Sequence, residues 1–319
     1  MNISVLGCGR WGSFLGWYLD NIGHNVIQWG LETEYTYQVL KNTKKNEYVD
    51  LSPSINLTSE IEFAVKSSEV LIISISSQSL DSFVKTLIKY DLTDKKFVLC
   101  MKGIEDGTGR RLSEIMVDNG INSKNIVVWV GPGHIQDFTK GIPNCMVIDG
   151  IDKDLKIELA NKFKSDLIKF YYGNDLIGSE IGAAAKNVMG IAAGMLDGIN
   201  YTTLKGPLMS RGTREVARLI NGLGGNGLSA YGLCHLGDYE TTLFSEHSHN
   251  RKFGEMFVKG QKFDKLAEGV KTASALVNLA EKVKVEIPIT NAINRIINCH
   301  IEPRDALLEL FNRDSKTEF

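Results

Sequence analysis

The strongest constraint on the fold is a glycine pattern at the amino terminus. A short apolar run at residues 3–6 leads into GCGRWG, which begins at Gly7, and apolar residues then recur at helical spacing. Strand, G-x-G-x-x-G and helix, in this order, are the context of a dinucleotide-binding fingerprint. Gly7 permits a tight turn, Gly9 lets the backbone approach a pyrophosphate, and Gly12 lets helix and strand pack closely. The sequence therefore predicts a Rossmann-type nucleotide site at its beginning.

Further apolar runs in the first half of the chain predict the other strands of a doubly wound sheet. They alternate with amphipathic stretches such as 80–87, as expected when helices cover a buried parallel sheet. Ligands of such sheets bind beyond the carboxyl ends of the strands, where Gly7, Lys102 and Gly131 fall. The predicted strands lie at 24–29, 70–76, 97–101 and 126–130, with shorter candidates at 145–148 and 167–171.

Beyond residue 173 strand-like runs disappear and helical periodicity takes over. We therefore predict an α/β protein: a Rossmann-type dinucleotide-binding domain at 1–177, followed by an all-helical domain at 178–319 that binds substrate and carries the catalytic groups. The helical patterns lie at 178–196, 209–223, 270–283, 290–297 and 303–311.

The helix predicted at 178–198 places one lysine among small and apolar residues. At about 100° per residue, its large apolar side chains share one face, and Lys186 points the opposite way beside Gly182 and Gly190. Glycine in a helix interior lowers the stability of the helix by about 1 kcal/mol relative to alanine. The glycines on this face are therefore expected to have a structural or functional role. One interpretation is an ammonium presented to a substrate in a crevice. The other is a solvated lysine on a tightly packed helix.

Composition and charge restrict the class of protein. Hydrophobic residues make up 43% and charged residues 23%, and the formal net charge of −2 gives no electrostatic case for nucleic acid. The five cysteines are odd in number and widely spaced, which favours reduced thiols and a cytoplasmic location. No apolar run approaches the ~20 residues of a membrane helix, and the first strand begins too early for a signal peptide. We expect no stable membrane insertion.

The end of the second predicted strand bears on cofactor choice. An acid there binds a ribose hydroxyl, whereas a base accepts the 2′-phosphate of NADP. The chain continues Gly30-Leu31-Glu32, without an arginine. This favours NAD(H) and leaves NADP(H) open.

Taken in order, the motifs of both halves resemble the cytosolic NAD(P)-dependent glycerol-3-phosphate dehydrogenase family. The resemblance implies an oxidoreductase that interconverts sn-glycerol 3-phosphate and dihydroxyacetone phosphate, and thereby supplies glycerol 3-phosphate for phospholipid synthesis. It rests on GCGRWG, KGIE from Lys102, Gly131-Pro132, GAAAKN around Lys186, LGD ending at Asp238, NRKFG from Asn250, EGVKTA from Glu268, and PIT from Pro288.

The resemblance also implies roles for individual residues. The lysine at Lys186 is the proton donor and acceptor, a role suited to an ammonium that stabilises and then protonates a developing alkoxide. Lys102, Asp238 and Asn187 surround the reacting carbon. The implied substrate-binding residues are Lys102, Gly131, Gly133, Ser248, His249 and Asn250, the last three holding the phosphate; those along the dinucleotide are Gly7, Gly9, Arg10, Trp11, Gly12, Ile135, His249 and Glu268.

Two departures from the family pattern keep other functions open. His249 stands where the family has arginine, and Gly133 replaces a common serine or threonine. A related dehydrogenase of another phosphorylated or acidic hydroxy compound is therefore one alternative, and a non-catalytic NAD-sensing module is a second. No metal is expected, because no carboxylate or thiolate completes a site at helical spacing with His235, His247 and His249. A homodimer is left open.

Overall fold

The computed structural model describes residues 1–315, 317 and 318, and these form two compact units. The first unit comprises Met1–Lys102 and Arg110–Glu180, and the second comprises Gly103–Gly109 and Ile181–Phe319. The first unit thus ends three residues after the predicted boundary at residue 177, and a short segment from the amino-terminal half belongs to the second unit. The functions that we assigned to the two domains stay predictions.

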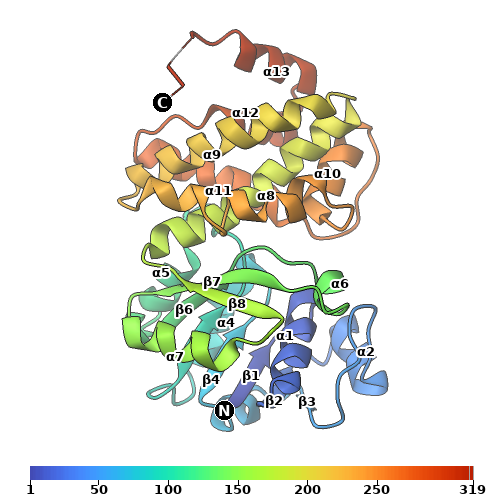
Figure 1. Cartoon of the computed structure of the whole chain (residues 1–319), viewed down its shortest axis with the longest axis vertical. Helices are drawn as coiled ribbons and strands as arrows, with labels where there is room; N and C mark the ends of the chain where they lie inside the picture. Colours follow the sequence, from blue (N-terminus) through green and yellow to red (C-terminus); the bar gives the residue numbers. More distant parts are fainter. Residues whose placement is uncertain (316, 319) are drawn as a thin grey trace. The chain divides into compact units, whose positions relative to one another are not determined.

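The first unit is built on one eight-stranded sheet in the order β3-β2-β1-β4-β5-β6-β7-β8 (Figure 1). Neighbouring strands are parallel except β6 and β7, which are antiparallel. The order reverses at β1 and β4, which is the switch point where Rossmann-type sheets bind ligands. The predicted fold class is confirmed. The strands are β1 (Asn2–Leu6), β2 (Asn25–Trp29), β3 (Asn56–Thr58), β4 (Val70–Ile73), β5 (Lys96–Leu99), β6 (Ile126–Val130), β7 (Asn144–Gly150) and β8 (Ile168–Tyr172).

Helices flank this sheet and complete its core. Trp129 on β6 is fully buried and stacks on Phe163 with ring centroids 5.4 Å apart. Helix α7 was not predicted, although Asp152 caps it by accepting a hydrogen bond from the Leu155 backbone N–H. The helices are α1 (Arg10–Asn21), α2 (Tyr35–Thr43), α3 (Ile61–Lys66), α4 (Leu80–Leu87), α5 (Leu112–Asp118), α6 (Ile135–Phe138) and α7 (Lys153–Phe163).

The second unit contains helices and no strand among its described residues, as predicted. The long helix α8 (Leu176–Gly198) begins in the first unit and continues through the second. None of the described helices combines the length and the apolar character that crossing a bilayer requires. The remaining helices are α9 (Lys205–Gly222), α10 (His249–Val258), α11 (Glu268–Lys282), α12 (Pro288–Cys299) and α13 (Pro303–Phe311).

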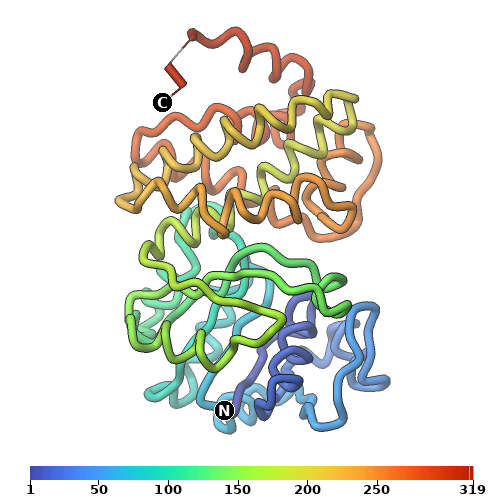
Figure 2. Tube along the Cα trace, in the orientation of Figure 1, coloured from blue at the N-terminus to red at the C-terminus, as the bar shows by residue number. Residues whose placement is uncertain are grey.

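Two glycines near the end of α8 allow another helix to pack closely against it. A Cβ atom on Gly194 would lie 1.8 Å from the carbonyl oxygen of Arg251, and one on Gly198 would lie 2.2 Å from a methyl group of Val258. These glycines therefore let α10 pack directly against the backbone of α8, and Figure 2 shows the two traces side by side. The face beside Lys186 was expected to be bare and open to a ligand, and this was wrong. A Cβ atom on Gly182 would lie 3.2 Å from the His235 Cβ, and one on Gly190 would lie 2.8 Å from a methyl group of Thr242, so other parts of the chain cover both glycines.

Candidate functional site

The amino-terminal glycine loop has the geometry that its spacing predicts. Gly7 has a φ of +128°, and a Cβ atom there would lie 2.2 Å from the Ser74 carbonyl oxygen. A Cβ atom on Gly12 would lie 2.1 Å from the Gly7 carbonyl oxygen, so α1 packs directly onto the turn. A Cβ atom on Gly9 would meet no atom within 4 Å. Gly7 thus makes the tight turn, Gly9 leaves the backbone open to approach, and Gly12 allows close packing, which is the division of roles that a pyrophosphate site requires.

Two of the predicted nucleotide-binding side chains belong to the first turn of α1, and a third begins α6. Arg10 donates to the Gln136 side-chain oxygen over 3.2 Å, and its guanidinium lies 5.5 Å from the centre of the Tyr48 ring. Trp11 is partly buried beside Phe138. Ile135 is only 1% exposed and packs into the core, so its side chain offers no surface to a ligand.

Lys102 and Gly131 are held together at the carboxyl ends of neighbouring strands. The Lys102 ammonium donates to the Gly131 carbonyl oxygen over 2.6 Å. Gly131 and Gly133 both have positive φ angles, of +126° and +155°. A Cβ atom on Gly133 would lie 2.3 Å from the Phe138 ring. The ring therefore occupies the space that a serine or threonine would need, which explains glycine at this position.

The end of β2 carries an acid that is engaged locally. Glu32 forms an ion pair with Lys41 over 2.6 Å and also accepts from the Gln38 amide. Leu31 is 49% exposed. No basic side chain stands at position 31, where it would meet a 2′-phosphate.

In the second unit, α8 carries Lys186 into a buried polar cluster. Its ammonium lies 2.9 Å from a carboxylate oxygen of Asp238 and donates to the Thr242 hydroxyl over 2.9 Å. Lys186 is 8% exposed and Asp238 is fully buried, so the solvated-lysine interpretation was wrong. Thr242 was missed by sequence reasoning. Its position four residues after Asp238, in the same turn-rich stretch, was the available signal.

The predicted phosphate-binding residues gather where α10 begins. Ser248 caps α10, because its hydroxyl oxygen accepts from the Arg251 backbone N–H over 3.3 Å. Asn250 accepts from the Gly269 N–H over 2.9 Å, which ties α10 to the start of α11, where Glu268 lies. His249 is half-buried, and its ring packs on Phe263.

Asn187 and the Lys186 cluster belong to the same neighbourhood of the second unit. A Cβ atom on Gly269 would lie 2.7 Å from the Asn187 carbonyl oxygen. A Cβ atom on Gly190, one turn after Lys186, would lie 2.8 Å from Thr242 and 3.3 Å from Asn250. The middle of α8 thus meets the residues proposed for proton transfer and those proposed for phosphate binding.

The three nearby histidines show no metal-binding arrangement. Among residues 1–315, 317 and 318, no group of three or more His, Cys, Asp or Glu side chains could hold a metal ion. His235 instead bonds the Gly182 carbonyl oxygen and the Tyr239 hydroxyl.

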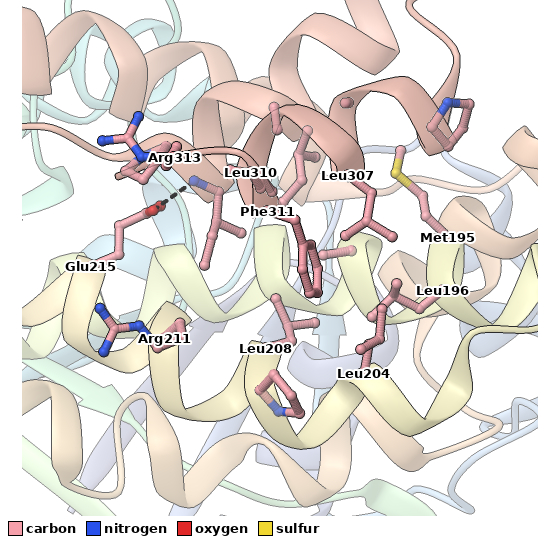
Figure 3. A pocket seen from close by; sticks show the side chains of 18 of the residues that line it. Met195, Leu196, Leu204, Leu208, Arg211, Glu215, Leu307, Leu310, Phe311 and Arg313 are labelled. Atoms are coloured by element: carbon pink, nitrogen blue, oxygen red, sulfur yellow. Dashed lines mark hydrogen bonds between the residues drawn. The ribbon is translucent and has the colours of Figure 1, made fainter. Parts of the chain in front are cut away.

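A cavity of about 630 Å³ in the second unit is not the candidate site. It lies between α13 and a floor formed by α8, α9 and α12, and neither Lys186 nor Asp238 lines it. Figure 3 shows Arg211, Glu215 and Arg313 at one end and apolar side chains along the rest. The charges of the lining residues balance, because three arginines and three acids line the cavity: Arg211, Arg218, Arg313, Glu215, Asp314 and Glu318.

The glycine loop at the switch point of a mostly parallel sheet, together with a helical unit carrying a buried lysine–aspartate pair, is the architecture of a dinucleotide-dependent dehydrogenase. Comparison with known proteins gives the family. Residues 2–156 match the model of the NAD-dependent glycerol-3-phosphate dehydrogenase N-terminus, and residues 175–308 match that of its C-terminus. The chain belongs to the NAD-dependent glycerol-3-phosphate dehydrogenase family.

Individual relatives agree along the whole chain. Glycerol-3-phosphate dehydrogenase (NAD(P)+) from Pelodictyon phaeoclathratiforme is 32% identical and covers 100% of this chain and 99% of its own. The enzyme of the same name from Fusobacterium nucleatum is also 32% identical, and the match covers 100% of this chain and 98% of that enzyme. The solved structure of glycerol-3-phosphate dehydrogenase from Coxiella burnetii shares the fold, with a TM-score of 0.90 at 22% identity over 98% of this chain and 99% of its own.

Proposed function

We propose that this chain interconverts sn-glycerol 3-phosphate and dihydroxyacetone phosphate, with Lys186 as the proton donor and acceptor. The observation that carries the proposal is the buried contact of Lys186 with Asp238 and Thr242, in a chain that belongs to this family from end to end. In the cell this reaction would supply glycerol 3-phosphate for phospholipid synthesis.

The chemistry follows from the charge that develops during ketone reduction. When bound, the nicotinamide supplies the hydride that adds to the carbonyl carbon. The carbonyl oxygen then gains negative charge, which the Lys186 ammonium stabilises by hydrogen bonding and neutralises by giving up a proton. Asp238 holds the ammonium in place, because its carboxylate lies 2.9 Å away and is buried. Lys186 regains its proton from water after turnover, and alcohol oxidation reverses each step.

The substrate-binding residues supply cations and N–H donors for a phosphorylated ketone. We assign Lys102, Asn187, Gly131 and Gly133 to the carbon end of the substrate. Ser248, His249 and Asn250 would bind the phosphate with the first turn of α10, whose N–H groups and partial positive charge favour anions.

The nucleotide-binding assignment rests on the fit of the glycine loop. A Cβ atom on Gly9 would meet no atom within 4 Å, which supports the approach of a pyrophosphate, and the first turn of α1 would supply N–H donors. Arg10, Trp11 and Glu268 would contact the dinucleotide by their side chains, and Ile135 by its backbone. We propose a preference for NAD(H), because Leu31 offers no cation for a 2′-phosphate.

We further propose that the protein acts in the cytoplasm, which the five free cysteines support. A homodimer stays a prediction, which light scattering coupled to gel filtration would test.

The activity is tested by following nicotinamide absorbance with the purified full chain. Dihydroxyacetone phosphate and a panel of keto acids and sugar phosphates are each offered with NADH and with NADPH. Our proposal expects the highest kcat/KM with dihydroxyacetone phosphate and NADH. Faster turnover of another compound would favour a related dehydrogenase, to which His249 and Gly133 point. Nucleotide binding without turnover of any substrate would favour a sensing module.

A further inference from the structure

We propose that His235 and Tyr239 form a buried clamp that positions Asp238 against Lys186, and that both are positioning residues for the reaction. This inference rests on the proposed role of Lys186. The sequence pattern pointed to His235 only as a potential metal ligand, and to no role for Tyr239.

The clamp is a chain of two hydrogen bonds around one imidazole. The Tyr239 hydroxyl lies 2.6 Å from His235 Nε2, and His235 Nδ1 lies 2.9 Å from the Gly182 carbonyl oxygen. Both side chains are fully buried, and their rings meet edge to face with centroids 4.8 Å apart. Each polar atom of the imidazole therefore has a partner inside the protein.

The partners determine which atom carries the proton. A carbonyl oxygen can only accept, so Nδ1 is the protonated nitrogen, and Nε2 of the neutral ring accepts from the tyrosine hydroxyl. Burial lowers the pKa of His235 to about 4, which keeps the ring neutral near neutral pH. Burial also raises the pKa of Tyr239, so that its hydroxyl keeps its proton. The directions of both bonds are therefore fixed under working conditions.

The clamp holds both ends of the turn that carries Asp238. His235 precedes the turn Leu236–Asp238 and Tyr239 follows it. Within the turn, the Asp238 N–H donates to the His235 carbonyl oxygen over 3.0 Å. Because the side chains of residues 235 and 239 meet in one hydrogen bond, the backbone of the turn between them, from which the Asp238 side chain projects, has little freedom to move.

The same imidazole is attached to the helical turn of Lys186. Gly182 lies four residues before Lys186 on α8, so its carbonyl is the one that the Lys186 backbone N–H faces. The absence of a side chain at Gly182 permits this approach, since a Cβ atom there would already lie 3.2 Å from the His235 Cβ. The ammonium and the carboxylate of the Lys186–Asp238 pair are thus both placed relative to one ring.

Three substitutions separate the parts of the clamp. Tyr239→Phe keeps the ring and removes the donor to Nε2. His235→Asn keeps an amide donor near the position of Nδ1 and removes the acceptor for Tyr239. His235→Leu removes both bonds at similar volume. Dihydroxyacetone phosphate reduction is measured with the full-length protein, together with the melting temperature of each variant.

We expect kcat to fall about 10-fold in Tyr239→Phe and His235→Asn and about 100-fold in His235→Leu, because small misplacements of reacting groups have effects of this size. KM for both substrates should stay within about twofold. A higher kcat in His235→Asn than in His235→Leu would show that the hydrogen bond to the Gly182 carbonyl oxygen contributes to the rate. Tyr18→Phe, in the first unit, is the matched control, since it removes a buried hydroxyl bonded to Phe163 and Ser165. It should lower stability and leave kcat unchanged.

The inference is overturned if Tyr239→Phe and His235→Asn keep kcat within twofold of the parent, or if KM changes in place of kcat. Tyr239→Phe is conservative enough to decide the matter even where His235→Leu does not fold. Lys186→Ala is assayed in parallel to separate the two proposals. An active Lys186→Ala refutes the proton donor itself, whereas an inactive Lys186→Ala beside fully active clamp variants refutes the clamp alone.

Discussion

Gly194 on α8 and Gly254 on α10 lie at a crossing where the two helices touch through their backbones. A Cβ atom on Gly194 would lie 1.8 Å from the Arg251 carbonyl oxygen, and one on Gly254 would lie 2.1 Å from the Ile191 carbonyl oxygen. Each helix therefore needs glycine at the point where the other crosses it. The crossing holds the first turn of α10, with Ser248 as its cap, beside the helix that carries Lys186.

We expect Gly194→Ala to destabilise the protein by about 1–3 kcal/mol or more, because the new methyl group can be accommodated only by separating α8 from α10. Urea unfolding of the full chain measures the effect. Gly206→Ala on α9 is the control, since no atom lies within 4 Å of its Cβ position. It should leave stability unchanged or raise it by up to ~1 kcal/mol. Equal stability of Gly194→Ala and the parent would contradict the close crossing.

Lys186→Ala should lower the rate of dihydroxyacetone phosphate reduction by about two to four orders of magnitude, because the developing alkoxide loses its proton donor. NADH affinity, measured by fluorescence titration, should stay nearly unchanged. Lys85→Ala, which removes an exposed ammonium paired with Asp81, should behave like the parent. A near-normal rate in Lys186→Ala would show that another group supplies the proton.

His249→Arg should lower KM for dihydroxyacetone phosphate, because a guanidinium is a permanent cation that binds phosphate through two parallel hydrogen bonds. Steady-state kinetics at neutral pH provides the test. His247→Arg adds the same charge at an exposed neighbouring position and should change KM less. An unchanged or higher KM in His249→Arg would place the phosphate elsewhere.

The cysteines should differ widely in their reaction with N-ethylmaleimide. Cys299 is exposed, whereas burial raises the pKa of Cys8 to about 12 and also raises the pKa of Cys100. Because the thiolate is the reacting form, Cys299 should be labelled first at about pH 8. Cys8 and Cys100 should stay unlabelled until urea unfolds the chain. Mass spectrometry of the labelled peptides would detect early modification of Cys8, which would contradict its burial.

Much of the fold could be predicted because its signals are local. The runs at 70–76 and 126–130 are apolar throughout, and the structure places β4 and β6 within them. The short strand β3 (Asn56–Thr58) was missed, because three residues carry too little periodicity to identify. The reversed direction of β7 was also not anticipated, since a buried strand has the same composition in either direction.

The candidate site was predictable only in part. Lys186 and Asp238 were singled out, and the structure brings them within 2.9 Å. Thr242 was not singled out, because its importance depends on which side chain faces it. Gly182 and Gly190 of α8 were misinterpreted for a related reason. Small residues permit a close approach, but their presence does not indicate whether a ligand or another part of the chain makes it.

The amino-acid sequence by itself determined the nucleotide loop. Each glycine of the loop is needed for a local reason, which the spacing of the motif and its flanking residues reveal. Only the tertiary structure decided that His235 and Tyr239 share one hydrogen bond beside Asp238, and that α10 packs on Gly194 and Gly198 of α8. The first of these contacts depends on how two side chains are oriented, and the second joins segments that are distant in the chain. Packing, and not residue type, selects among the partners that each side chain could accept.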